Sequence, residues 1–147
     1  FEKTTYNDIP YKFEAGTPNI ADVVAFKSAI EFVDSIGKVN IAAHENELLS
    51  YAKQKALAIP GLKIIGDAPN KVSVLSFIIE GVHPFDIGQM LDASGIAVRT
   101  GHHCTRPLMD HFGIEGTIRA SFAVYNTKEE IDRMMESLAM VIRFLKP

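Results

Sequence analysis

One short segment holds most of the reactive side chains in this sequence. Cys104, the single cysteine among the 147 residues, directly follows His102 and His103, and Arg99 lies shortly before them. Positive charge near a thiol favours the thiolate, which is the nucleophilic form of cysteine. Gly101 allows a sharp backbone turn, so a loop that follows a strand can project the thiol toward solvent. The segment therefore indicates a cysteine that acts as a nucleophile.

Two structural interpretations of the same segment compete with this one. A lone cysteine is by default a small buried hydrophobe, and residue chemistry alone leaves that interpretation as open as the nucleophilic one. A metal site would use His102, His103 and Cys104, with His83 or His111 as a further ligand. The side chains of adjacent residues diverge, however, and no familiar zinc spacing is present. We therefore expect no metal.

A cysteine hydrolase is a third alternative. It would need a histidine oriented by an Asn or Asp side chain, usually far away in the sequence. His44 and His83 are available, but nothing around either residue favours that role. The sequence also lacks a glycine-rich phosphate loop of the P-loop or Rossmann type.

The periodicity of apolar residues predicts the elements that position these side chains. Helices are expected over residues 20–36, about 40–58, 84–94 and 107–111, and a last helix follows Thr127. Strands are expected over residues 62–65, 72–79, 96–99 and 117–124. Asn40 is the expected cap of the second helix, and Thr127 and Glu130 form a capping box before the last one. Arg119, in the last strand, is a second guanidinium that could reach the cysteine.

This mixed order of short strands and helices predicts an α+β fold, with a small sheet of three to four mainly antiparallel strands covered by helices. Residues 1–19 are expected to form an extended arm, because they hold little periodicity and include Pro10 and Pro18. Residues 20–147 are expected to form one α+β domain. Phe1 in place of an initiator Met suggests a processed product or a fragment of a longer chain.

Composition limits the classes of function. The formal net charge of -3 argues against a nucleic-acid surface, which needs clustered Lys and Arg. No apolar stretch approaches the roughly 18 residues that a membrane span requires. A single cysteine excludes an internal disulfide and favours a reducing compartment, so we expect a cytoplasmic location.

Three segments resemble those of group II (SufS-type) cysteine desulfurases, which are fold-type I, class V aminotransferase-like enzymes. They are residues 99–104 (RTGHHC) with 107–109 (PLM), residues 119–127 (RASFAVYNT) with 129–132 (EEID), and residues 13–19 (FEAGTPN). The segments occur in the family's order with comparable spacing, and the resemblance covers nearly the whole chain.

The resemblance implies a function for several residues. Members of the family use pyridoxal phosphate to convert L-cysteine to L-alanine, and Cys104 would hold the released sulfur as a persulfide for a sulfur-acceptor protein in iron–sulfur cluster assembly. Arg119 would bind the substrate carboxylate through its planar fork, and Arg99 would assist. Gly16 and Thr17 would reach the phosphate of the partner subunit's cofactor in a homodimer. His102 and His103 are expected to shape the loop and raise the local potential.

The sequence also departs from the family's pattern. The lysine that forms the Schiff base lies upstream of these segments in the family, usually after a histidine, and no lysine here follows a histidine. We therefore expect the C-terminal small domain of a fold-type I enzyme, without the cofactor-binding large domain and inactive alone. A selenocysteine lyase of the same scaffold and a non-catalytic interaction module remain alternatives.

Overall fold

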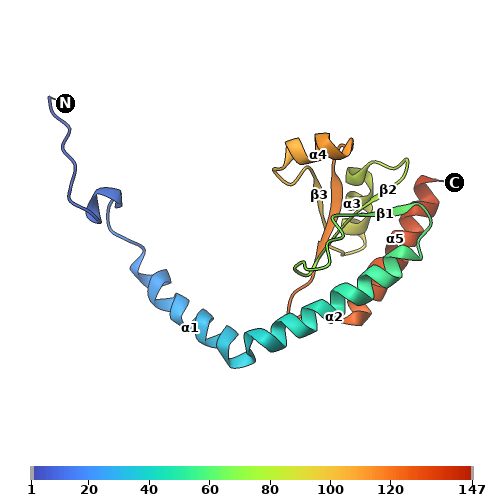
Figure 1. Cartoon of the computed structure of the whole chain (residues 1–147), viewed down its shortest axis with the longest axis horizontal. Helices are drawn as coiled ribbons and strands as arrows, with labels where there is room; N and C mark the ends of the chain where they lie inside the picture. Colours follow the sequence, from blue (N-terminus) through green and yellow to red (C-terminus); the bar gives the residue numbers. More distant parts are fainter. Residues whose placement is uncertain (1, 147) are drawn as a thin grey trace. The chain divides into compact units, whose positions relative to one another are not determined.

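The computed structural model describes residues 2–146, and the chain divides into two compact units, Phe1–Lys38 and Val39–Pro147. In the first unit a short 3₁₀ helix, η1 (Tyr11–Phe13), precedes helix α1 (Ile20–Ile36) (Figure 1). The Asn19 side chain caps α1 by accepting a hydrogen bond from the backbone N–H of Asp22. No residue of α1 is buried, although it carries the expected apolar stripe.

Helix α1 belongs, with the N-terminal segment, to the first unit. The division into an arm of residues 1–19 and a domain of residues 20–147 stays a prediction.

The second unit contains a four-stranded antiparallel sheet with the strand order β1-β2-β4-β3. The strands are β1 (Leu62–Ile65), β2 (Val74–Ile79), β3 (Arg99–Gly101) and β4 (Thr117–Ser121). The helices are α2 (Lys38–Leu57, of which Lys38 falls in the first unit), α3 (Pro84–Ala93), α4 (Arg106–Phe112) and α5 (Lys128–Leu145). The predicted α+β class and the small antiparallel sheet are confirmed.

The two faces of the sheet have different surroundings. Because side chains alternate along a strand, Leu75 and Phe77 of β2 share one face with Ile118 of β4. These residues form a single buried cluster with apolar side chains of α2, α3 and α5. Three helices therefore cover one face and bury the core there.

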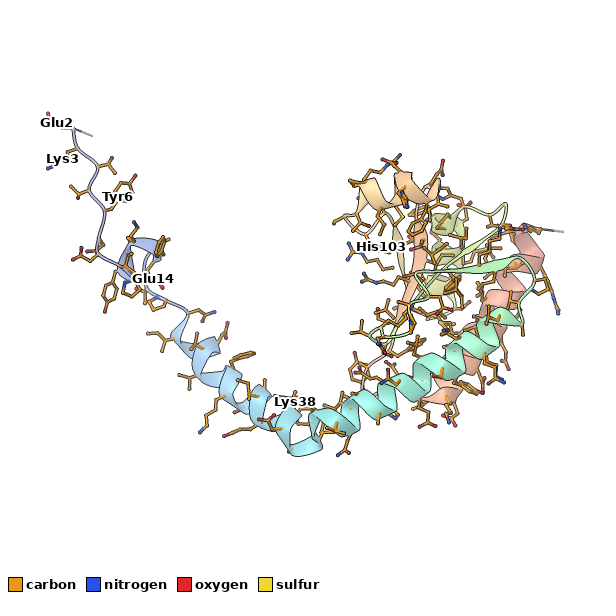
Figure 2. All side chains as sticks on the ribbon, viewed as in Figure 1. Glu2, Lys3, Tyr6, Glu14, Lys38 and His103 are labelled. Carbon is orange, nitrogen blue, oxygen red and sulfur yellow. The ribbon has the colours of Figure 1, made fainter. Side chains whose placement is uncertain are left out.

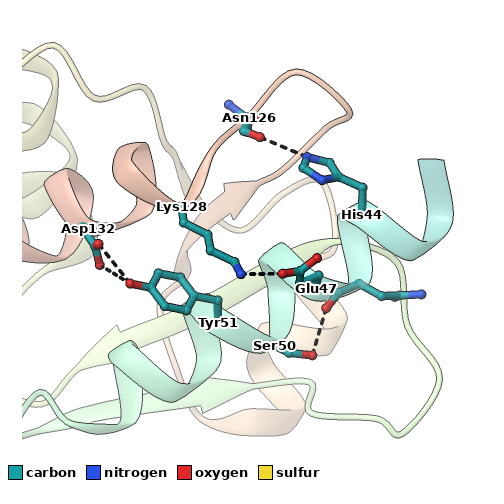
Figure 3. A network of polar contacts seen from close by, with 8 residues as sticks. His44, Glu47, Ser50, Tyr51, Asn126, Lys128 and Asp132 are labelled. Atoms are coloured by element: carbon teal, nitrogen blue, oxygen red, sulfur yellow. Dashed lines mark hydrogen bonds and ion pairs between the residues drawn. The ribbon is translucent and has the colours of Figure 1, made fainter. Parts of the chain in front are cut away.

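Polar contacts also join α2 to the start of α5 (Figure 3). The Tyr51 hydroxyl donates to the Asp132 carboxylate at 2.8 Å, and Lys128 pairs with Glu47. The ring of His44 contacts the carbonyl of Asn126 at 3.1 Å. These bonds fix α5 along α2 at the edge of the core.

The capping box that the sequence predicts before α5 is present. The Thr127 side chain accepts from the N–H of Glu130, and the Glu130 side chain accepts from the N–H of Thr127. Each bond satisfies a backbone N–H that the first turn of a helix would otherwise leave unpaired.

Several predicted boundaries are wrong by a few residues. Helix α2 begins at Lys38, so Asn40 lies inside its first turn and does not cap it. Strand β3 spans Arg99–Gly101 instead of 96–99, because the N–H of Ile96 still donates to the carbonyl of Leu91 at the end of α3. Strand β4 ends at Ser121, since the N–H of Ala123 turns to the Asn126 side chain.

Candidate functional site

The loop between β3 and α4 presents Cys104. His103 and Cys104 have φ angles of 53° and 61°, in the left-handed region that residues other than glycine seldom adopt. The N–H of Cys104 donates to Nδ1 of His102 at 3.1 Å, and the N–H of Thr105 donates to the His102 carbonyl at 2.9 Å. Cys104 is exposed, so the alternative of a buried structural cysteine is wrong.

Two arginines lie directly opposite each other beside this loop. Arg99 on β3 pairs in register with Arg119 on β4, so both side chains project from the same face of the sheet. Nη2 of Arg99 lies 3.8 Å from Sγ of Cys104. Neither guanidinium forms an ion pair with any of residues 2–146. Like charges in such a pair repel, so an anion bound between them would be stabilised.

Arg119 also lacks a hydrogen bond that its burial would normally require. Its Nε is buried and has no hydrogen-bond partner within residues 2–146. Leaving a charged donor unpaired is costly, and a bound anion would remove that cost. Arg119 is thus prepared to bind an anion, and the fork of a guanidinium suits a carboxylate.

A pocket of about 290 Å³ adjoins Arg119 on the face opposite the core. It is lined by Ile65, Gly66, Lys71, Val72, Val74, Ser76, His103, Thr105, Leu108, Met109, Phe112, Thr117 and Arg119. The described lining contains cationic, hydroxyl and apolar groups and no carboxylate. Helix α4 contributes Met109 to this pocket, so it partly covers the face that α2, α3 and α5 leave open.

His103 links the cysteine loop to the sheet. Its Nε2 lies 2.9 Å from Oγ1 of Thr117 on β4, and Figure 2 labels His103 beside this sheet. Burial lowers the pKa of His103 first, and the positive charge of Arg119 lowers the pKa further. The ring is therefore neutral at neutral pH and adds no charge beside Arg119.

The other histidine alternatives are engaged elsewhere. His83 pairs with Glu115 at 3.2 Å, and His44 contacts the carbonyl of Asn126. Among residues 2–146 no group of three or more His, Cys, Asp or Glu side chains is placed to hold a metal ion. No helix in the same part of the chain is long and apolar enough to cross a membrane.

Gly16 and Thr17 lie in the first unit and are exposed. Gly16 has a φ of 147°, which disfavours a side chain there. Nothing in the structure tests the contact with a partner's cofactor that the resemblance gives to these two residues.

Thr117 and Lys71 are site residues that the sequence did not single out. Thr117 lies two residues before Arg119 on the same strand, so alternation alone could have placed the two on one face. Lys71 had no such signal, because it lies in the turn between β1 and β2. Its Nζ donates to the carbonyl of Gly66 at 2.9 Å.

The open face does not fit a complete pyridoxal phosphate site. That cofactor needs a lysine for its Schiff base and an acidic or basic partner for its pyridine nitrogen. Lys71, the only lysine of the pocket lining, binds a backbone carbonyl. On the helices, Lys53, Lys55 and Lys128 are paired with the carboxylates of Asp67, Asp132 and Glu47, in that order.

Comparison of the sequence with known proteins identifies the family of the chain. The class-V aminotransferase model matches residues 1–134. A cysteine desulfurase of Synechococcus elongatus is 52% identical over 143 residues, which are 97% of this chain and 22% of that protein. A probable cysteine desulfurase of Xylella fastidiosa is 44% identical over 145 residues, which are 99% of this chain and 35% of that protein. The chain thus spans about a third or less of the length of these relatives.

Solved structures agree with the sequence comparison. The apo cysteine desulfurase of Thermococcus onnurineus superimposes with a TM-score of 0.85 at 34% identity, covering 92% of this chain and 34% of that one. The S-sulfonic acid form of the cysteine desulfurase CsdA from Escherichia coli gives a TM-score of 0.82 at 34% identity, covering 92% of this chain and 33% of that one. The chain therefore belongs to the class-V aminotransferase family, and within that family it is similar to the cysteine desulfurases.

Proposed function

We propose that this chain supplies the sulfur-accepting part of a cysteine desulfurase, with Cys104 as the residue that takes sulfur from L-cysteine. One observation carries the proposal: an exposed thiol lies 3.8 Å from the guanidinium of Arg99, and Arg119 projects from the same face without a counter-ion among residues 2–146. A nucleophile thus lies beside a pair of anion-binding side chains. This is what a site needs if it is to bind the carboxylate of an amino acid and attack the sulfur of the same molecule.

The reaction has a simple balance. The Cys104 thiolate attacks the sulfur of L-cysteine, a sulfur–sulfur bond forms, and the carbon–sulfur bond breaks. The bonding electron pair stays on carbon, which takes a proton and becomes the methyl group of L-alanine. Cys104 is left as a persulfide. Pyridoxal phosphate, the family's cofactor, supplies the electron sink for such chemistry, and the residues that hold it lie outside the open face.

The residues of the open face have separate roles in this proposal. Arg119 binds the substrate carboxylate through its fork, and Arg99 favours the thiolate and assists in holding the anion. Apolar side chains in the lining of the pocket beside Arg119 lower the local polarity, which strengthens the interaction of Arg119 with an anion. The ring of His103 is neutral, so the positive charge near the anion comes from the two guanidinium groups and from Lys71 in the pocket lining.

The finer assignments follow the resemblance. In a cytoplasmic homodimer, Gly16 and Thr17 reach the phosphate of the partner subunit's cofactor. The Cys104 persulfide passes to a sulfur-acceptor protein for iron–sulfur cluster assembly. This transfer is chemically reasonable because Cys104 is exposed and an acceptor thiol can approach it.

A Cys104→Ser variant of the full protein, supplied with pyridoxal phosphate and L-cysteine, tests the proposal. Alanine formation should fall by about 1000-fold or more, because removal of a nucleophile removes the route that depends on it. Mass mapping of the wild-type protein should find one extra sulfur on the peptide that contains Cys104. Alanine formation by the variant at the wild-type rate would overturn the assignment.

Two controls separate the alternatives. Activity of the Cys104→Ser variant on selenocysteine should be retained, because selenium leaves more readily than sulfur and needs no thiol acceptor. If both substrates are lost together, a persulfide role for Cys104 has no support. The 147-residue chain alone should form no alanine when pyridoxal phosphate is added, since its open face lacks a cofactor site.

A further inference from the structure

The backbone that presents Cys104 is strained. His103 and Cys104 are consecutive, neither is a glycine, and both have φ angles in the left-handed region, at 53° and 61°. Such a conformation persists only where the surrounding structure holds it. The bonds that involve His102 and Thr105 close the turn, but they join residues of the same exposed loop. They do not anchor the loop to the rest of the fold.

One contact joins the loop to β4, with 2.9 Å between Nε2 of His103 and Oγ1 of Thr117. A second contact, of Sγ of Cys104 with Nη2 of Arg99 on β3, is longer at 3.8 Å. Thr117 belongs to β4, 14 residues further along the chain, and the residue is 1% exposed. Its β-branched side chain has little rotational freedom. In the sheet, Thr117 also pairs in register with Gly101, which begins the turn into the loop. Thr117 therefore meets the loop twice, through the strand pairing and through its hydroxyl.

The strand pair is closed tightly at this end. A Cβ on Gly116 would lie 2.7 Å from the backbone carbon of Gly101, so the two strands could not approach in this way with any side chain there. The hydroxyl of Thr117 is consequently held on a rigid support, while the ring that it contacts belongs to a strained loop. The fixed hydroxyl of Thr117 can hold the ring of His103 in one position. His103 directly precedes Cys104 in the chain, so this position affects where the thiol lies.

We propose that Thr117 is a positioning residue for the nucleophile: its hydroxyl holds His103, and His103 fixes the left-handed loop that keeps the Cys104 thiol beside Arg99. The inference deepens the proposed function and rests on it for its catalytic meaning. The geometric claim concerns the thiol alone, and it can be measured without substrate or cofactor.

The test is the rate at which iodoacetamide alkylates the 147-residue chain at neutral pH. Cys104 is the single cysteine, so the rate reports one site. Thr117→Val keeps the shape of the side chain and removes the hydroxyl, and it should slow alkylation about fivefold, because the thiol is no longer held beside the guanidinium. Thr117→Ser keeps the hydroxyl and should stay within about twofold of the wild type.

His103→Phe removes the other partner of the contact. It should slow alkylation about as much as Thr117→Val, and the double variant should be no slower than the slower single variant, since both changes break one interaction. Additive effects of the two changes would overturn the proposal. Alkylation of either single variant at the wild-type rate would also overturn it. If Thr117→Val fails to fold, the rate measured for His103→Phe decides between the two outcomes.

Measurement of alanine formation separates this inference from the proposed function. One result would be that Thr117→Val lowers the alkylation rate and, in the full protein, lowers kcat while KM for L-cysteine changes little. That result would support both the positioning role of Thr117 and the proposed function. Wild-type alkylation in Thr117→Val, together with an alanine reaction that depends on Cys104, would remove the positioning role alone. If the alanine reaction is independent of Cys104, the proposed function fails even where the alkylation results hold.

Discussion

The two faces of the sheet show how one set of strands serves stability and chemistry separately. On the covered face, Leu75, Phe77 and Ile118 are 0% exposed and pack against three helices. On the open face, the neighbours of these residues along the same strands are Ser76 and Arg119, which are half-buried beside a pocket. Because side chains alternate with a period of two, each strand contributes to both faces without conflict.

The open face contains several features that destabilise the folded chain. Arg99 and Arg119 are like charges directly opposite each other, the Nε of Arg119 is buried without a partner in residues 2–146, and the cysteine loop is in a strained conformation. Each of these costs free energy of folding. The covered face supplies the stability that lets the sheet hold them, which is the pattern expected of a functional site.

Substitution in the covered face should have the largest effect on stability. Phe77→Ala removes a fully buried aromatic ring and should lower the free energy of unfolding by about 3–5 kcal/mol. Ile78→Ala, at the next position but on the open face, is the matched control and should cost about 1–2 kcal/mol, because Ile78 is only half-buried. Denaturant titration measures both, and equal losses would contradict the division between the faces.

Substitution of Arg119 on the open face should affect function and leave stability nearly unchanged. Arg119→Lys keeps the charge and loses the fork, so kcat/KM of the full protein for L-cysteine should fall about 10- to 100-fold. The free energy of unfolding should change by no more than about 0.5 kcal/mol, because Arg119 has no ion pair to lose within the described residues. Arg106→Lys on α4, where Arg106 pairs with Asp110, is the control and should leave kcat/KM unchanged.

The smallest expected effect is a pH dependence that comes from His103. Its pKa in the folded chain lies below the ordinary value of 6.5, through burial first and then the charge of Arg119. His103 therefore binds a proton more readily in the unfolded chain than in the folded one. Its contribution to the free energy of unfolding is complete above pH 6.5 and is lost as the pH falls below that value. The His103→Phe variant should lose this part of the pH dependence, as measured by the midpoint of thermal unfolding between pH 7 and pH 5. An unchanged profile would show that His103 is not the group responsible.

Local signals in the sequence predicted most of the elements well. The spacing of apolar residues together with Gly37 gave helix α1 its observed bounds, and Thr127 with Glu130 located the start of α5. The predictions that failed depended on partners. Strand β3 is defined by its pairing with β4, which a single-strand pattern does not contain. Asn40 has the side chain of a cap, but the helix had already begun at Lys38.

The sequence by itself determined the α+β class, the capping box before α5, the resemblance to cysteine desulfurases and the candidate site residues, because these depend on residue types and short spacings. The tertiary structure decided that Arg99 and Arg119, 20 positions apart, face each other across two strands, and that Thr117 meets His103. It also decided that Cys104 is exposed and not buried. The reason is physical: burial, cross-strand register and the strained loop follow from long-range pairing, and no local pattern encodes which distant strand a residue will oppose.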